Sequence, residues 1–236
     1  GGFLAGLSRF NPARKTFTHI LHSKQGVLPL NYDDVRHIYE DRDGDIWVAT
    51  NGDGVFRFRN GDPAQHEQFV TNLQDIEHAL RTNYCLITFE DSARRLWVGT
   101  YKGLSCFERE KKSWRNYTSD GPDSSGLSNN WIYALCEDRE RRLWVGTARG
   151  LNLLDEASGT FRGFGAREGL PGEIINGIVE DAQGYLWIST NNGLAKFNAA
   201  EAVANARASN TVAVYTEHDG LQGAEYIHGA AAKLTT

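Results

Sequence analysis

Short apolar runs separated by polar turns recur along the chain. In the stretch 131–164, an apolar run at 131–136 is followed by a polar turn at 137–142 and a second apolar run at 143–147. A third run spans 151–154, and residues 160–164 alternate between apolar and polar positions as an exposed outer strand does. Because these runs are too short for core helices, the pattern predicts four antiparallel β-strands in this stretch.

The same pattern occurs four times, each time around a tryptophan. A five-residue motif of the type Leu-Trp-Val-Gly-Thr lies at 46–50, 96–100, 143–147 and 186–190, and an Asp preceded by Glu stands six residues before each Trp. A Gly follows each Thr within a few residues, where a turn between strands calls for positive φ. Four copies in register do not arise by chance, so these positions define a structural repeat. They are Trp47, Trp97, Trp144 and Trp187, with Asp41, Asp91, Asp138 and Asp181.

An all-β repeat of this length is typical of a β-propeller blade. Each Trp is then expected to lie buried between its own sheet and the next, while Thr and Asp fix the turns through side-chain to backbone bonds. A β-sandwich is the competing all-β fold, but a sandwich does not repeat a whole sheet along the sequence. We therefore predict an all-β propeller of four-stranded antiparallel blades, with function in the loops where the copies differ.

The copies at the two ends are incomplete. Residues 6–11 match the third-strand pattern of 193–198, and Gly220-Leu221 matches the signal that precedes a first strand. The chain also starts at Gly1 and contains no Met, so we expect a piece of a longer protein. A single propeller domain over 1–236 is expected to comprise a partial blade (1–24), four whole blades (25–70, 71–118, 119–165 and 166–216) and the start of a further blade (217–236).

Two insertions interrupt the repeat. In 71–81, the spacing of Leu73, Ile76 and Leu80 predicts a short helix, and the Ala-rich segment 199–209 also favours a helix. We interpret both segments as surface decorations of the propeller.

Composition excludes several classes of protein. Apolar residues make up 40% of the chain and charged residues 23%, which excludes intrinsic disorder, and no apolar run is long enough for a membrane helix. The net charge of -5 gives no basic footprint, so we expect no nucleic-acid partner. The three Cys, at positions 85, 106 and 136, stand in apolar runs and are expected to be buried free thiols.

The combined pattern closely resembles the two-component regulator propeller repeat. It consists of Gly-Leu, a first strand ending in Glu-Asp, then Leu-Trp-Val-Gly-Thr, and a third strand that closes on Phe; the resemblance extends from Gly6 to Ala232. It implies a seven-bladed periplasmic sensor propeller of a hybrid histidine kinase or a related diguanylate cyclase. Only parts of the parent outside this chain would tether it to the membrane. The resemblance further implies signalling by a small-molecule ligand, often a saccharide, or by homodimer contacts, without catalysis in this portion.

The acidic residues at the turns could hold the turns, bind a metal or take part in catalysis. Residues 41–45 begin like a calcium loop, but the later Glu ligand is missing and the other copies lack the pattern, which favours a hairpin turn. The Glu-Asp pairs recur in every copy, and adjacent strand residues point to opposite faces, which favours a structural role. The sequence shows no metal-ligand spacing among its seven His and no nucleotide or nucleophile motif, so it predicts no metal, no cofactor and no catalytic residue.

A ligand is expected on the face where first strands begin and where second strands turn into third strands. The copies differ most there, and aromatic rings beside polar and charged side chains suit a polyhydroxylated molecule. The candidate ligand-binding residues are Tyr32, Tyr84, Asn129, Asn130, Trp131, Tyr101, Lys102, Arg149, Glu173, Asn191 and Asn192. A solvated rim that binds nothing is the alternative interpretation of the same residues.

Two other functions remain open at this point. A propeller lyase or hydrolase would need a cluster near the axis, for which Arg36, His37, Tyr133 and Asn176 on the first strands are the available residues. A protein-interaction scaffold is the second alternative, although the repeats lack the Trp-Asp ending typical of that class.

Overall fold

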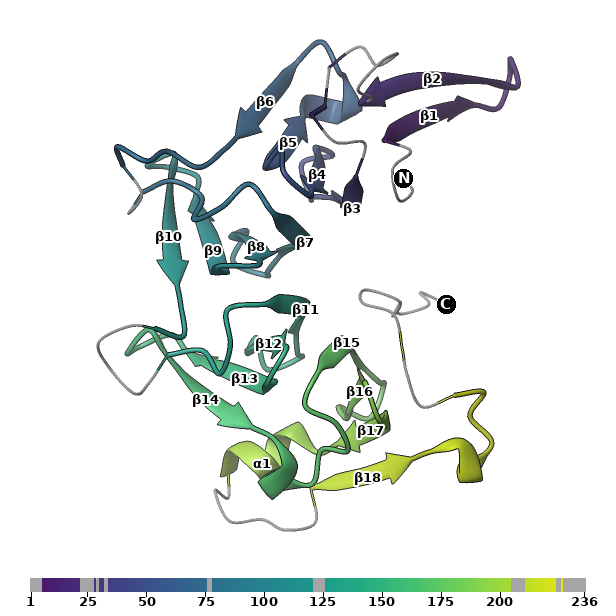
Figure 1. The fold of residues 1–236 in the computed structure, drawn as a ribbon, viewed down its shortest axis with the longest axis vertical. Helices are drawn as coiled ribbons and strands as arrows, with labels where there is room; N and C mark the ends of the chain where they lie inside the picture. The colour runs from purple at the N-terminus through teal and green to yellow at the C-terminus, as the bar shows by residue number, and fades with distance from the viewer. Residues whose placement is uncertain are drawn as a thin grey trace. The chain divides into compact units, whose positions relative to one another are not determined.

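The structure, a computed structural model, describes residues 6–21, 28, 30–31, 34–75, 78–120, 126–204, 211–223 and 226. Within these residues the strands form four four-stranded sheets and one two-stranded hairpin (Figure 1). The chain divides into two compact units, Gly1–Asn116 and Tyr117–Thr236. The predicted fold class, all-β with four-stranded antiparallel blades, is confirmed.

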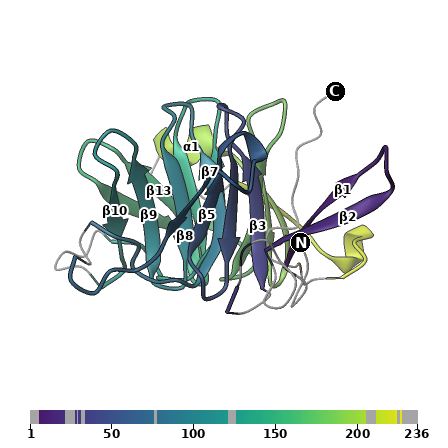
Figure 2. The same ribbon diagram turned by 90° about the horizontal axis from the view of Figure 1, so that it is seen from above.

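The first unit contains the hairpin and two of the sheets. The hairpin pairs β1 (Leu7–Asn11) with β2 (Thr16–Leu21). The first sheet contains, in order, β3 (Val35–Glu40), β4 (Ile46–Thr50), β5 (Val55–Phe58) and β6 (His66–Phe69), with a 3-10 turn, η1 (Arg59–Gly61), before β6. The second sheet contains β7 (Cys85–Glu90), β8 (Leu96–Thr100), β9 (Gly103–Glu108) and β10 (Ser113–Tyr117), which Figure 2 shows in this order across the sheet.

The second unit repeats this architecture. One sheet contains β11 (Ile132–Glu137), β12 (Leu143–Thr147), β13 (Gly150–Asp155) and β14 (Thr160–Phe164). The other contains β15 (Ile175–Glu180), β16 (Leu186–Thr190), β17 (Gly193–Phe197) and β18 (Val212–Tyr215). The remaining elements are η2 (Ala166–Glu168), α1 (Ala199–Ala204) and η3 (Glu217–Asp219).

First strands of successive sheets lie side by side within each unit, β3 against β7 and β11 against β15. Each first strand has a β-bulge after its first residue, where its register with the second strand shifts. Bulges bend a strand and re-aim a side chain. The residues at the four bulges are Arg36, Leu86, Tyr133 and Asn176.

Trp47 and Trp144 are packed between two sheets of their units, as predicted, whereas Trp187 is only half-buried. Trp47 of β4 is fully buried in a core that includes Leu96 and Phe107 of the next sheet. Trp144 of β12 is likewise fully buried, and its ring centroid lies 5.7 Å from that of Phe197 on β17. Burying an indole between two sheets removes a large apolar surface from water, so Trp47 and Trp144 each fasten one sheet to the next within their unit.

The repeated Asp residues close the turns between first and second strands. In each copy the indole Nε1 of the Trp donates to the Asp Oδ2, while the Asp Oδ1 accepts the backbone N–H four residues ahead. The sequence predicted the backbone bonds but not the bond to the indole. The four Nε1–Oδ2 distances are 2.8 Å for Trp47–Asp41, 2.8 Å for Trp97–Asp91, 2.7 Å for Trp144–Asp138 and 2.9 Å for Trp187–Asp181.

The repeated Thr residues close the turns between second and third strands. Thr147 donates its hydroxyl to the carbonyl of Gly150 at 2.9 Å and accepts the N–H of Arg149 at 3.0 Å. Gly150 has φ +110, and an added Cβ would lie 2.7 Å from the carbonyl oxygen of Phe164, so only Gly fits there. The turn thus brings Arg149 to the end of the sheet.

The two insertions differ in outcome. The second contains helix α1 over Ala199–Ala204, and residues 205–209 lie outside the described part. The helix predicted for 71–81 is wrong, because described residues 71–75 and 78–81 form turns and bends. Asn72 accounts for part of this difference, since its side chain accepts the N–H of Gln74 and its carbonyl that of Asp75. Leu80 is fully buried while Leu73 is 85% exposed, so the segment does not present one apolar helical face.

Cys85 and Cys106 are buried and form no disulfide, as predicted. Cys136 also forms no disulfide, but it is half-buried and not buried as predicted. Burial raises the pKa of the Cys106 thiol to about 12, so it stays protonated at neutral pH. None of the described helices has the length and hydropathy to span a membrane.

Candidate functional site

Two kinds of loop meet at one end of the sheets in each unit. In the second unit, the turn between β12 and β13 contacts the connection that leads to β15, because Gly150 N–H donates to the carbonyl of Glu173 at 2.7 Å. In the first unit, Gly52 and Gly54 N–H groups both donate to the carbonyl of Asn83, at 3.0 and 2.9 Å. The same backbone link therefore forms a composite loop edge in each unit, from a turn of one sheet and the entry to the next.

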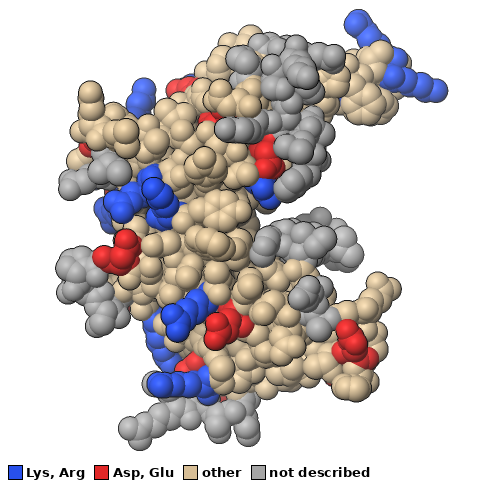
Figure 3. All heavy atoms as spheres, viewed as in Figure 1, with Lys and Arg blue, Asp and Glu red and all other residues tan. Residues whose placement is uncertain are grey.

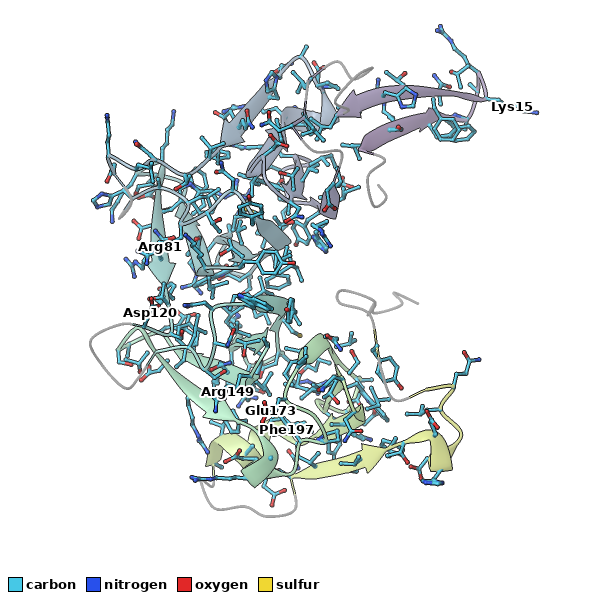
Figure 4. The ribbon with its side chains drawn as sticks, in the orientation of Figure 1. Lys15, Arg81, Asp120, Arg149, Glu173 and Phe197 are labelled. Carbon is cyan, nitrogen blue, oxygen red and sulfur yellow. The ribbon has the colours of Figure 1, made fainter. Side chains whose placement is uncertain are left out.

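The loop edge of the second unit brings together Trp131, Arg149 and Glu173. The carbonyl of Trp131 accepts the N–H of Ala148 at 3.0 Å, which places the backbone of Trp131 next to the turn that contains Arg149. The Trp131 side chain is 50% exposed, and Arg149 and Glu173, which Figure 4 labels, are also exposed. An exposed ring with one cation and one carboxylate beside it can stack on a sugar face and bond to its hydroxyls.

The Asn residues that precede β11 mainly stabilise the loop before this strand. Asn129 accepts the backbone N–H of Trp131 at 2.8 Å and so fixes the loop just before the strand. Asn130 accepts the N–H of Ser119 at 2.8 Å and donates to Asp120 at 3.1 Å. Asn130 uses both ends of its amide in loop contacts and Asn129 uses its oxygen, which leaves them less available to a ligand than the sequence pattern suggests.

Asn191 and Asn192, in the turn between β16 and β17, show the same behaviour. Asn191 accepts the N–H of Ile174 at 3.0 Å through its side chain, and Asn192 donates to the carbonyl of Pro171 at 2.9 Å. These contacts attach the turn to the connection before β15, in the same sheet. The two residues are exposed, but their amides hold the loop edge in shape.

The loop edge of the first unit contains Tyr84, Tyr101 and Lys102. Tyr101 N–H donates to the carbonyl of Tyr84 at 3.2 Å, so the two aromatic residues stand on neighbouring segments. Tyr84 is 49% exposed and Lys102 is exposed. Tyr32, the remaining predicted ligand residue, lies outside the described residues.

A polar network that sequence reasoning missed lies at the start of β3. Asp34 is buried, and its Oδ2 accepts bonds from Arg36 Nη2 at 2.7 Å and from Asn51 Nδ2 at 2.8 Å. Its Oδ1 has no partner among the described residues. A charged residue directly before a first strand, next to a variable turn, is the sequence signal that could have indicated this network.

Among the residues considered for an enzyme site, Arg36 and His37 are held by other side chains, whereas the buried Oδ1 of Asn176 has no hydrogen-bond partner among the described residues. His37 on β3 reaches the neighbouring sheet, where its Nδ1 accepts the N–H of Thr88 at 3.3 Å and lies 3.0 Å from the Thr88 hydroxyl. Burial lowers the pKa of His37 below its ordinary value, so the ring is neutral at pH 7. Tyr133 and Asn176 are both buried at their bulges.

The Glu-Asp pairs join neighbouring sheets. Asp41 holds its own turn and also accepts Arg109 Nη2 from the next sheet at 3.0 Å. Glu90 of that sheet accepts the N–H of Arg42 at 3.0 Å. In the second unit, Glu180 accepts the N–H of Arg139 at 3.0 Å in the same manner. The carboxylates therefore fasten one turn to the next instead of converging on a reacting bond. Among the described residues, His, Cys, Asp and Glu form no group of three that could hold a metal ion.

Repeated four-stranded sheets, indoles buried between them and composite loop edges define this chain as a β-propeller repeat protein. Residues 29–52, 126–149 and 169–192 match the family described as "Two component regulator propeller". The chain thus carries two-component regulator propeller repeats. The copy around Trp97, which follows the insertion 71–81, is outside the matched segments but has the same Asp–indole bond.

Solved structures of similar fold include extracellular domains of bacterial regulators. The extracellular domain of the hybrid two-component system BT3049 from B. thetaiotaomicron is 23% identical, with a TM-score of 0.69, over 83% of this chain and 26% of that one. The extracellular domain of the hybrid two-component system BT4673 from the same organism is 25% identical, with a TM-score of 0.67, over 84% and 27%. The chain therefore spans about a quarter of these structures.

The chain also resembles an enzyme, but only in its fold. Virginiamycin B lyase from Staphylococcus aureus is 12% identical, with a TM-score of 0.54, over 77% of this chain and 55% of that one. Identity at this level shows a shared propeller architecture and does not extend the lyase activity to this chain. No curated protein matches the chain significantly.

Proposed function

We propose that this chain is part of the extracytoplasmic sensor propeller of a bacterial two-component-type regulator, located in the periplasm as the soluble part of an inner-membrane protein. The observation that carries the proposal is the match of three repeats to the two-component regulator propeller, together with structural likeness to extracellular domains of such regulators. In this function the propeller binds a signal and performs no reaction itself, while any kinase or cyclase activity belongs to other parts of the parent.

The signal is a small molecule, such as a saccharide, that binds at a loop edge. Trp131 supports this choice because half of its indole surface is exposed although large aromatic rings are usually buried. Arg149 and Glu173 beside it supply a donor and an acceptor for hydroxyl groups. Binding shifts the populations of signalling states if one state has the tighter site, and dimer contacts between copies are the alternative means of transmission.

A ligand screen on the whole chain tests this function. Thermal unfolding is measured with a panel of neutral and acidic mono- and oligosaccharides, on the native chain and on Trp131→Ala. We expect a saturable rise in melting temperature for at least one sugar, lost in Trp131→Ala but retained in Phe17→Ala, which removes an exposed ring from β2.

Two results would count against the proposal. An empty ligand screen combined with a monomer at all concentrations would leave both modes of sensing without support. Chemical turnover of a bound sugar would instead indicate the enzyme function. The parent reading frame gives an independent check, since a downstream membrane helix followed by a kinase or cyclase is expected.

A further inference from the structure

Residues 78–81, the last part of the insertion, pack along the outer strand of the second sheet in the first unit. Trp114 N–H on β10 donates to the carbonyl of His78 at 2.9 Å, and the Asn116 side chain donates to the carbonyl of Ala79 at 2.9 Å. Fully buried Leu80 anchors the segment in the core below. The insertion is therefore fixed on the sheet, and the residue after this anchor, Arg81, lies beside β10 (Figure 4).

A cleft of about 440 Å³ lies between this insertion and β10. Its volume falls within the range of about 300–1,000 Å³ that is usual for small-molecule sites. Figure 3 shows Lys and Arg atoms gathered over the region of β9 and β10. We call this cleft the β10 cleft; its lining includes His78, Arg81, Glu108, Lys111, Trp114 and Arg115.

Positive charge exceeds negative charge in the β10 cleft. Glu108 is the one carboxylate of the lining, and two cations share it: Lys111 Nζ at 2.7 Å from Oε2 and Arg115 Nη2 at 2.8 Å from Oε1. Hydrogen bonds and charge from these cations hold the pKa of Glu108 below its ordinary value. Arg81 is half-buried and forms no side-chain hydrogen bond or ion pair with any described residue. This local excess occurs in a chain with a net charge of -5.

We propose that the β10 cleft is a binding site for a small molecule with a carboxylate, sulfate or phosphate group, and that Arg81 is its main anion contact. A half-buried guanidinium that has no carboxylate partner in the described part of the chain has lost part of its hydration, and an anionic ligand would offset that cost by charge-assisted, forked hydrogen bonds. Lys111 and Arg115 add favourable charge, and Glu108 is the internal competitor for them. The site is built by the insertion on an outer strand, so it does not depend on the sensor function proposed for the loop edges.

Titration calorimetry on the whole chain tests the proposal. The probes are inorganic phosphate, inorganic sulfate and glucuronate, with glucose as the neutral match of glucuronate, all at one ionic strength set with chloride. We expect saturable binding of at least one anion and no binding of glucose. The anion with the highest affinity then identifies the chemical group that the site recognises. If none of the three anions binds with a Kd below about 10 mM, the proposal is wrong, because a Kd above that value is weaker than specific binding usually is.

Three substitutions locate the site. Arg81→Gln should weaken anion binding by about tenfold, since one charge-assisted contact is lost. Glu108→Gln should strengthen binding, because it removes the carboxylate that competes with the ligand for Lys111 and Arg115. Surface ion pairs contribute little to stability, so the fold should persist. Arg167→Gln, the same change at an exposed Arg of η2, should have no effect. Equal affinity in Arg81→Gln and the native chain, or weaker binding in Glu108→Gln, would overturn the assignment.

Discussion

At the scale of single residues, one repeated carboxylate in each copy determines how firmly the blade turn is held. Asp138 is buried and accepts the Trp144 indole, the Arg142 guanidinium and two backbone N–H groups through its two oxygens. Every one of these partners is a donor. A neutral amide at this position therefore cannot satisfy them all, although it has nearly the same shape.

Asp138→Asn should consequently destabilise the chain by about 2–4 kcal/mol, since a buried donor loses its acceptor and the amide introduces a second donor. Urea unfolding followed by Trp fluorescence measures the change. Glu140→Gln, an equivalent replacement at an exposed position of the same turn, should stay within about 0.5 kcal/mol of the native chain. Equal stability of the two variants would show that the Asp–indole bond is dispensable.

His37 gives the first unit a predicted response to acid. Its pKa is lowered by burial, so in the range between its folded-state pKa and about 6.5 the unfolded chain binds a proton that the folded chain does not. The contribution of His37 to stability is therefore complete above about pH 6.5 and decreases as the pH falls through that range. His37→Gln should show a smaller loss of stability between pH 7.5 and pH 5 than the native chain, measured by urea unfolding at each pH. The exposed His66→Gln should follow the native profile, and identical profiles for all three proteins would contradict this role of His37.

The scale of the strand and the turn shows where sequence reasoning succeeds and where it fails. Trp, Thr and Asp recur in register because each occupies the same position in a sheet, so comparison of copies within one sequence located the strands and their turns. The insertion 71–81 has no counterpart to compare, and its apolar spacing indicated a helix. In the structure one Leu is buried and another exposed, which local spacing alone does not reveal.

The candidate site was predictable to a similar degree. Variable loops were correctly assigned to one end of each sheet pair, because backbone topology fixes where turns lie. The use of each side chain was not predictable, since an Asn in a turn serves equally as a ligand contact or as a cap, and Asn129 and Asn191 cap their loops. Arg81 escaped prediction because it lies in the insertion and becomes distinctive only through the absence of a partner in the described structure.

Close contact between sheets restricts the small residue of the Trp motif. A Cβ added to Gly146 on β12 would lie 2.6 Å from Ile175 Cγ2 on the next sheet and 2.9 Å from Ala134 Cβ on β11. Gly146→Ala should therefore cost about 1–3 kcal/mol through overpacking. Gly163→Ala on β14 is the control, because nothing lies within 4 Å of its added Cβ. Equal unfolding midpoints in urea for both variants would mean that the sheets separate to accept the methyl group.

At the scale of the whole molecule, we expect a local loss of stability to stay within the unit where it arises. In repeat proteins each copy depends mainly on its neighbours, and the chain forms two compact units, each of which contains a hydrophobic core. Gly146 belongs to the second unit, so the loosening caused by Gly146→Ala should remain local. Hydrogen exchange followed by mass spectrometry should show faster exchange in peptides from β11 to β18 and unchanged exchange in β3 to β6. Gly163→Ala should leave both regions as in the native chain. Uniformly faster exchange throughout Gly146→Ala would show that the repeats unfold as one cooperative body, and the local description of this propeller chain would then be wrong.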